Sequence, residues 1–113
     1  MTILEALKIV AAVATIATGL LALLRPRSAQ SFTGLTIAGG RGVTEVRAVL
    51  GGLFIALGAA GFLFGLPAYR TLGLGYLTIG AVRLVSMFLD KSLVSSNWIS
   101  LAFEVVFGVI LIL

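Results

Sequence analysis

The sequence predicts an all-α fold, a transmembrane bundle of four helices. Four apolar segments are long enough to cross the hydrocarbon core of a bilayer, which takes about 20 helical residues. The chain is 60% hydrophobic and only 11% charged, too little polar surface for a soluble domain of this size. We therefore expect a single transmembrane domain over residues 1–113, with spans at about 3–24, 43–66, 69–89 and 95–113.

The first apolar segment carries Glu5 and Lys8 near its start and is followed by Arg25-Pro26-Arg27. A cleaved signal peptide is the alternative to a retained helix here. We expect a retained helix, because the positive flank tends to hold the segment in the membrane. Mostly small residues recur at helical spacing on one face, which suits close packing against a neighbouring helix: Lys8, Ala12, Thr15, Gly19 and Ala22.

The longest connection covers residues 28–42 and ends in Gly39-Gly40-Arg41-Gly42. We expect a flexible linker that ends where the second helix begins. The alternative is a glycine-rich turn that binds an anion through its backbone amides.

Glycines recur at helical spacing in the second and third spans, where small residues let helices approach closely. Arg47 falls on the same face as the glycines of the second span, so we expect its charge to point into the bundle. Gly61 and Gly65 also form a G-x-x-x-G pattern. The packing candidates are Gly51, Gly58, Gly61, Gly65, Gly73 and Gly80.

Three charged residues of different spans are predicted to lie at one depth. Arg47 is five residues past Gly42, about 7 Å along a helix, while Arg83 and Glu104 are each seven residues from a loop, about 10 Å. An isolated charge at the centre of the membrane costs about 2.5–3.5 kcal/mol on insertion scales, so pairing is expected. We expect Glu104 to pair with one arginine and Glu45 to reach another from the rim.

This Arg47/Arg83/Glu104 cluster has two open interpretations. It is either a buried ion-pair network that fixes the helix register or a ligand site. Two interior arginines face one interior glutamate, which leaves one guanidinium for the phosphate, carboxylate or carbonyl of an anionic lipid or a quinone-like molecule. Tyr76 would then add a hydroxyl group.

A small proton-coupled transporter that uses Glu104 is the alternative function. The arginines count against it, because they would hold the carboxylate ionised and repel a cationic substrate.

The chain contains neither histidine nor cysteine. It therefore lacks the usual general base, the usual nucleophile and the usual metal ligands. We expect no enzymatic activity, no cofactor and no metal site. The net charge of +4 is better explained by loop orientation at a membrane than by nucleic-acid binding. Membrane lipids are the expected partners, with a larger membrane complex or a homo-oligomer as further possibilities.

Positive charge also predicts the orientation of the chain. The first and third loops carry Arg25, Arg27, Arg41 and Lys91, whereas the opposite side carries Lys8 and Arg70. Because basic loops stay in the cytoplasm, both termini are expected outside it.

Three short motifs carry a resemblance to a known family: Arg-Ala-Val-Leu-Gly-Gly at 47–52, Gly-Ala-Val-Arg-Leu at 80–84, and Glu104 in the last span. The chain resembles a family of small bacterial four-span membrane proteins of unknown function and is more distantly similar to DoxX-like proteins. The resemblance implies a four-helix bundle in the bacterial inner membrane, with functional interest at Arg47, Arg83 and Glu104. It also implies an accessory role in a respiratory or quinone-linked membrane complex.

Overall fold

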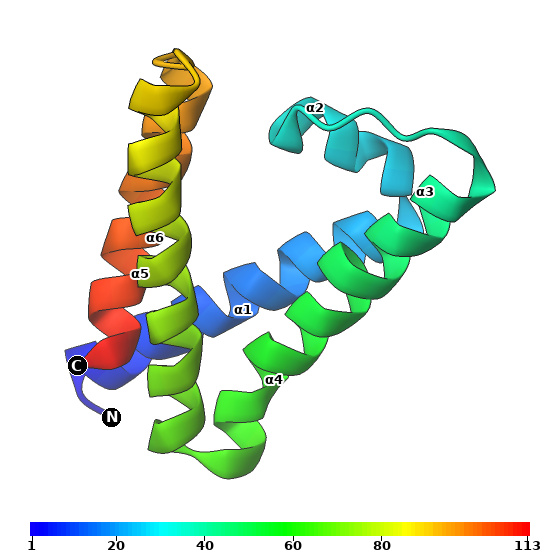
Figure 1. Cartoon of the computed structure of the whole chain (residues 1–113). Helices are drawn as coiled ribbons and strands as arrows, with labels where there is room; N and C mark the ends of the chain where they lie inside the picture. Colours follow the sequence, from blue (N-terminus) through cyan, green and yellow to red (C-terminus); the bar gives the residue numbers. More distant parts are fainter.

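The computed structural model describes all 113 residues and consists of helices joined by short connections (Figure 1). The predicted all-α fold class is confirmed. In chain order the elements are α1 (Ile3–Leu24), the 3-10 turn η1 (Pro26–Ser28), α2 (Ala29–Thr33), α3 (Gly39–Glu45), the π-helical segment η2 (Val46–Leu53), α4 (Phe54–Phe64), α5 (Leu66–Leu89) and α6 (Ser95–Ile112).

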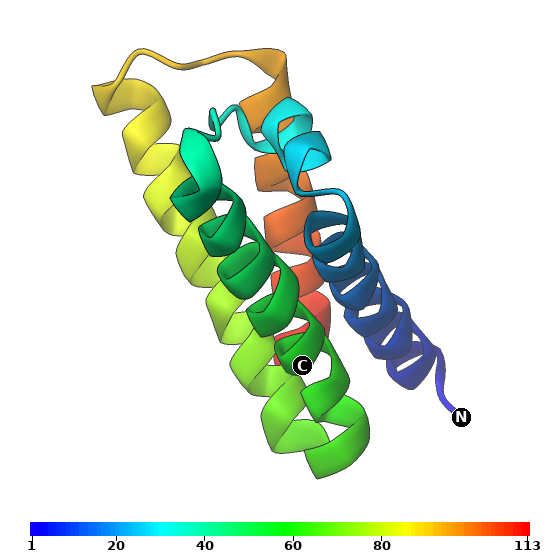
Figure 2. The same cartoon turned by 90° about the vertical axis from the view of Figure 1, so that its right-hand side faces the viewer.

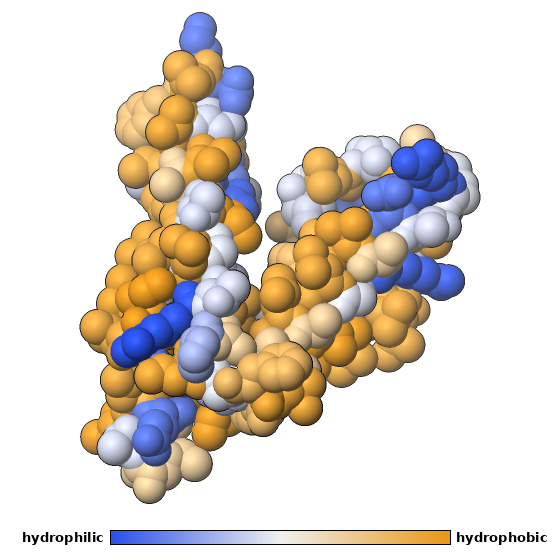
Figure 3. Space-filling model, turned by 60° about the horizontal axis from the view of Figure 1, so that its bottom comes forward, coloured by the Kyte–Doolittle hydropathy of each residue, from blue (hydrophilic) through white to orange (hydrophobic).

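Four helices are long and apolar enough to cross a membrane: α1, the continuous helix Gly39–Phe64 made of α3, η2 and α4, then α5 and α6. Hydrophobic residues cover most of the molecular surface seen in Figure 3. Side chains such as Phe64 and Leu89 are 75% and 76% exposed. Surfaces of this kind are compatible with an integral membrane protein and would be costly in water.

The second and third helices begin earlier than predicted. The second begins at Gly39 instead of residue 43, so the glycine cluster is the first turn of a helix and not a turn that precedes one. The third begins at Leu66 because Pro67 lies in its first turn, where a missing amide N–H costs no helical hydrogen bond. Gly65, at φ 80°, reverses the chain just before it.

The four long helices form two antiparallel pairs (Figures 1 and 2). In one pair α1 lies beside η2 and α4, and in the other α5 lies beside α6. The pairs meet near the α4–α5 turn and the chain termini, and they diverge toward the opposite end (Figure 1). At the meeting end the buried Lys8 ammonium donates a hydrogen bond to the Leu111 carbonyl of α6 at 3.3 Å.

Glycines bring α1 close to the second helix. A Cβ atom added at Gly58 would lie 2.8 Å from the Ala12 carbonyl, and one at Gly51 would lie 3.1 Å from the Leu23 Cα atom. A Cβ atom added at Gly19 of α1 would lie 2.8 Å from the Gly51 carbonyl oxygen. The whole small-residue face predicted for α1 is buried. Because helices in lipid gain little from hydrophobic burial against each other, such close backbone contacts hold them together.

The other glycines have separate roles. Gly73 of α5 approaches the Gly108 carbonyl of α6, and Gly80 lies 3.6 Å from Glu104 Cβ, both measured from an added Cβ atom. Gly61 makes room for the Tyr69 ring at the start of α5. The predicted packing role of Gly65 is wrong, because Gly65 lies outside the helix and nothing comes within 4 Å of an added Cβ atom.

Substitution of Gly58 by alanine tests the contact between α1 and α4. Gly58→Ala should lower the free energy of unfolding by about 1–3 kcal/mol, because a methyl group there forces the helices apart. Gly52→Ala is the matched control, since its Cβ atom would meet only the Arg47 carbonyl, at 3.9 Å. Unfolding in mixed detergent, followed by circular dichroism, measures both. Equal effects of the two variants would contradict the role given to Gly58.

Candidate functional site

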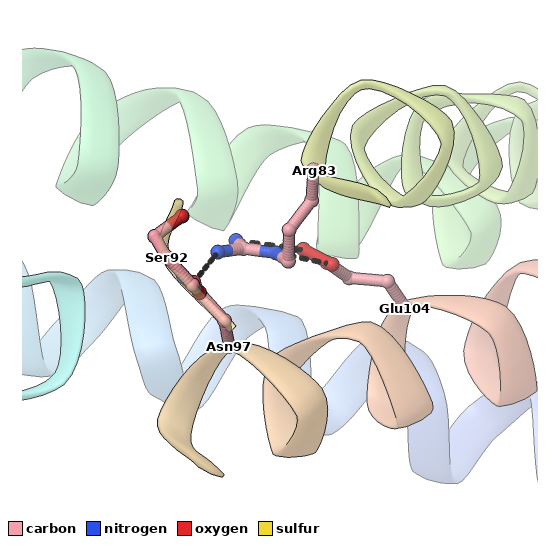
Figure 4. A network of polar contacts seen from close by, with 4 residues as sticks. All are labelled: Arg83, Ser92, Asn97 and Glu104. Carbon is pink, nitrogen blue, oxygen red and sulfur yellow. Dashed lines mark hydrogen bonds and ion pairs between the residues drawn. The ribbon is translucent and has the colours of Figure 1, made fainter. Parts of the chain in front are cut away.

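A polar network joins α5 to α6 at the end where the two helix pairs diverge. Arg83 projects from α5 toward Glu104 and Asn97 of α6 (Figure 4). Arg83 Nε donates to Glu104 Oε1 at 2.6 Å, and Nη2 donates to Oε2 at 2.9 Å. Two parallel bonds of this kind form the strongest arginine–carboxylate geometry. The expected pairing of Glu104 with an interior arginine is therefore present, with Arg83 as its partner.

Asn97 extends the network into the loop that joins the helices. Its side-chain oxygen accepts from Arg83 Nη1 at 3.0 Å, and its side-chain nitrogen donates to the Ser92 carbonyl at 2.9 Å. Sequence analysis missed this residue. The available signal was its position seven residues before Glu104, which places both on one face of α6.

The two charges of the pair differ in exposure. The Glu104 side chain is 9% exposed and the Arg83 side chain 31%. Gly80 lets α6 approach α5 next to the carboxylate, so the acid is enclosed between the helices. The guanidinium lies at the edge of this enclosure, and its outer side remains open.

Arg83 has unused hydrogen-bond donors. A guanidinium carries five N–H groups. One on Nε, one on Nη2 and one on Nη1 are used by Glu104 and Asn97. Two N–H groups are left for a ligand, while the charge of the arginine is already balanced by Glu104.

A groove of about 750 Å³ runs along α5 and ends at this network. Small and hydroxyl-bearing residues of one α5 face form its floor. The Thr71 and Thr78 hydroxyls donate to backbone carbonyls of their own helix, so toward the groove they offer only acceptor lone pairs. The lining residues are Thr71, Leu74, Gly75, Thr78, Ile79, Val82, Arg83, Ser86, Met87, Ser92 and Asn97.

Tyr76 lies outside the network and lines a second cavity, of about 260 Å³, where the two helix pairs meet. The Thr15 hydroxyl donates to the Ala11 carbonyl, so Tyr76 is the donor in its own bond with Thr15. Its ring packs edge to face on Phe107. The Tyr76 proton is thus used to join α5 to α1 and is not offered to a ligand.

The prediction that Arg47 joins Arg83 and Glu104 is wrong. Arg47 is exposed, and its side chain forms no hydrogen bond or ion pair with another residue. Arg47 lies in η2, where each turn holds more residues than an α-turn. Its position is therefore off the helix face that Gly58 and Gly61 share. In addition, η2 packs on α1 and not on the α5–α6 pair.

The prediction for Glu45 is also wrong. Instead of reaching an interior arginine, Glu45 accepts from Arg41 Nε at 3.3 Å, one helical turn away. Both side chains are exposed, so this pair adds little stability. The helix begins early enough to place Arg41 at helical spacing from Glu45, which the predicted boundary did not allow.

Known protein families, curated proteins and solved structures contain no match to this chain. The resemblance to four-span and DoxX-like proteins stays a prediction. No group of three histidine, cysteine, aspartate or glutamate side chains comes together anywhere in the structure.

The Arg83–Glu104 pair should contribute strongly to stability. Arg83→Gln or Glu104→Gln should each lower the free energy of unfolding by about 3 kcal/mol, because either change leaves one charge without its partner between helices. The double variant should lose less than the sum of the two. Unfolding in mixed detergent yields the coupling energy of this double-mutant cycle.

The exposed Arg41–Glu45 pair provides the control cycle. Its coupling energy should stay below about 0.5 kcal/mol, as for other solvated pairs one helical turn apart. A coupling energy for Arg83 and Glu104 no larger than this value would show that the buried pair does not hold α5 to α6.

Proposed function

We propose that this protein is a non-enzymatic integral membrane protein that binds a lipid-like molecule in the groove along α5. The proposal rests on Arg83, which lines the end of the groove and offers two unused N–H groups there. The volume of about 750 Å³ falls in the range of about 300–1,000 Å³ that is usual for small-molecule sites.

The charge balance at Arg83 favours a neutral head group. Glu104 already compensates the guanidinium, so an added phosphate or carboxylate would bring an uncompensated negative charge next to a buried carboxylate. A carbonyl oxygen accepts hydrogen bonds from the free N–H groups without that cost. A quinone or an acyl ester carries such a carbonyl on an apolar tail, and the tail would lie against Leu74, Ile79 and Val82.

The geometry does not favour a proton-coupled transporter. Such a mechanism needs a carboxylate that gains and loses a proton in each cycle. The Glu104 carboxylate instead accepts three contacts from Arg83, so it is held in an ion pair with a fixed cation. An accessory role in a larger membrane complex stays a prediction, in which case the bound molecule would be shared with a partner.

Gly75→Leu tests ligand binding without altering the network. A Cβ atom at Gly75 meets nothing within 4 Å, so a leucine side chain fills the groove and leaves α5 and α6 in contact. We expect binding of an alkyl quinone to the detergent-solubilised protein to fall by about tenfold or more, a loss of about 1.4 kcal/mol. Gly52→Leu is the control, because Gly52 is similarly open but lies in η2, away from the groove.

A second probe tests the head group. An alkyl phosphate of the same chain length should bind more weakly than the alkyl quinone. Preference for the phosphate would contradict the neutral-head assignment, and unchanged quinone binding in Gly75→Leu would contradict the groove as the binding site. Exclusion of both probes by a co-purified protein would show that the groove is a protein interface instead.

A further inference from the structure

Three exposed arginines lie where the C-terminal end of α1 meets η2. Arg25 caps the C-terminus of α1, Arg27 follows in η1, and Arg47 lies in η2. In Figure 3, hydrophilic surface gathers at the end of the pair formed by α1 and the second helix that lies farthest from α5 and α6.

The packing of the two helices places these arginines near the same end of the contact between α1 and η2. Gly51 of η2 touches Leu23 of α1, and the two helices run antiparallel. Arg47 precedes Gly51 by four residues, and Arg25 and Arg27 follow Leu23 by two and four. Arg25 and Arg47 therefore lie within about one helical turn of this contact, on the same side of it, and Arg27 follows in η1. We call Arg25, Arg27 and Arg47 the basic surface.

The basic surface has no acidic partner in the chain. None of its three guanidinium groups donates a hydrogen bond or forms an ion pair. The chain has four acidic side chains in all, and every one is bonded elsewhere: Glu5 to the Thr2 amide, Glu45 to Arg41, Asp90 to Ser86, and Glu104 to Arg83. Three guanidinium groups thus face the surroundings with uncompensated charge.

The position of the basic surface relative to the apolar helices indicates its ligand. The helix Gly39–Phe64 has 26 residues, more than the roughly 20 that cross the hydrocarbon core, so its first turns extend toward the head groups. Arg47 can reach that layer by extending its long side chain. Apolar side chains lie beside the arginines on the side of the spans: Leu24, Val49 and Leu53 are 71%, 46% and 47% exposed.

We propose that the basic surface binds the phosphate of an anionic phospholipid, whose acyl chains lie along the exposed apolar residues of α1 and η2. Guanidinium groups bind phosphate oxygens through paired N–H donors, and here no carboxylate competes for them. The apolar flank distinguishes a lipid from free phosphate, which has no use for it. This site is separate from the α5 groove, where the arginine is already neutralised.

Native mass spectrometry of the intact, detergent-purified protein tests the proposal with phosphatidylglycerol, phosphatidylcholine and inorganic phosphate as probes. The wild-type protein should bind phosphatidylglycerol about tenfold or more in preference to phosphatidylcholine. The variant Arg25→Gln/Arg27→Gln/Arg47→Gln should lose that preference. Its thermal unfolding should match the wild type, because the three side chains are exposed and unbonded.

The control variant Arg70→Gln/Lys91→Gln removes two positive charges from other places and should keep the preference. Loss of the preference in both variants would overturn the proposal, since only net charge would matter. Retention in the first variant would overturn it as well. Displacement of the lipid by millimolar inorganic phosphate would overturn the assignment to a lipid. Gly75→Leu should leave this binding unchanged, which separates it from the groove.

Discussion

The ion pair between Arg83 and Glu104 constrains the rest of this structure. A carboxylate enclosed between two apolar helices needs a bonded cation, and Arg83 supplies it with good geometry. The pair fixes how far α5 slides along α6, and through Asn97 it also fixes the connecting loop. With one side of α5 committed to α6, an adjacent face is left to form the groove.

The two helix pairs are held by different interactions. Between α1 and the second helix, glycines allow backbone contact at Gly19, Gly51 and Gly58. Between α5 and α6, glycine contacts are supplemented by the ion pair. The contacts between the pairs lie mainly between α4 and α5 and between α1 and α6, and they include the hydrogen bonds of Lys8 with Leu111 and of Thr15 with Tyr76. This uneven distribution explains why the pairs meet at one end and diverge at the other (Figure 1).

Separation of Arg47 from Arg83 gives the protein two arginine-containing regions, one with a neutralised guanidinium and one with uncompensated positive charge. At Arg83 a carboxylate neutralises the guanidinium, so the remaining N–H groups suit a neutral acceptor. At Arg25, Arg27 and Arg47 no carboxylate is within bonding distance, so the region suits phosphate. Arginine thus suits a neutral acceptor in one region and phosphate in the other, because only the first region has a carboxylate beside it.

The sequence by itself determined the all-α fold, the number of long apolar helices and the pairing of Glu104 with an interior arginine. Each follows from hydropathy, helix length and the cost of an isolated charge in a membrane, which are local properties of the chain. Only the tertiary structure decided which arginine Glu104 binds. Depth counted along separate helices places Arg47, Arg83 and Glu104 at one level, but it says nothing about which helices are neighbours. The π-helical segment then turned Arg47 outward, and the contact of η2 with α1 kept it away from α5 and α6. The Arg83–Asn97 bond and the α5 groove likewise depend on how α5 packs on α6, because that geometry is set by contacts between residues of different helices.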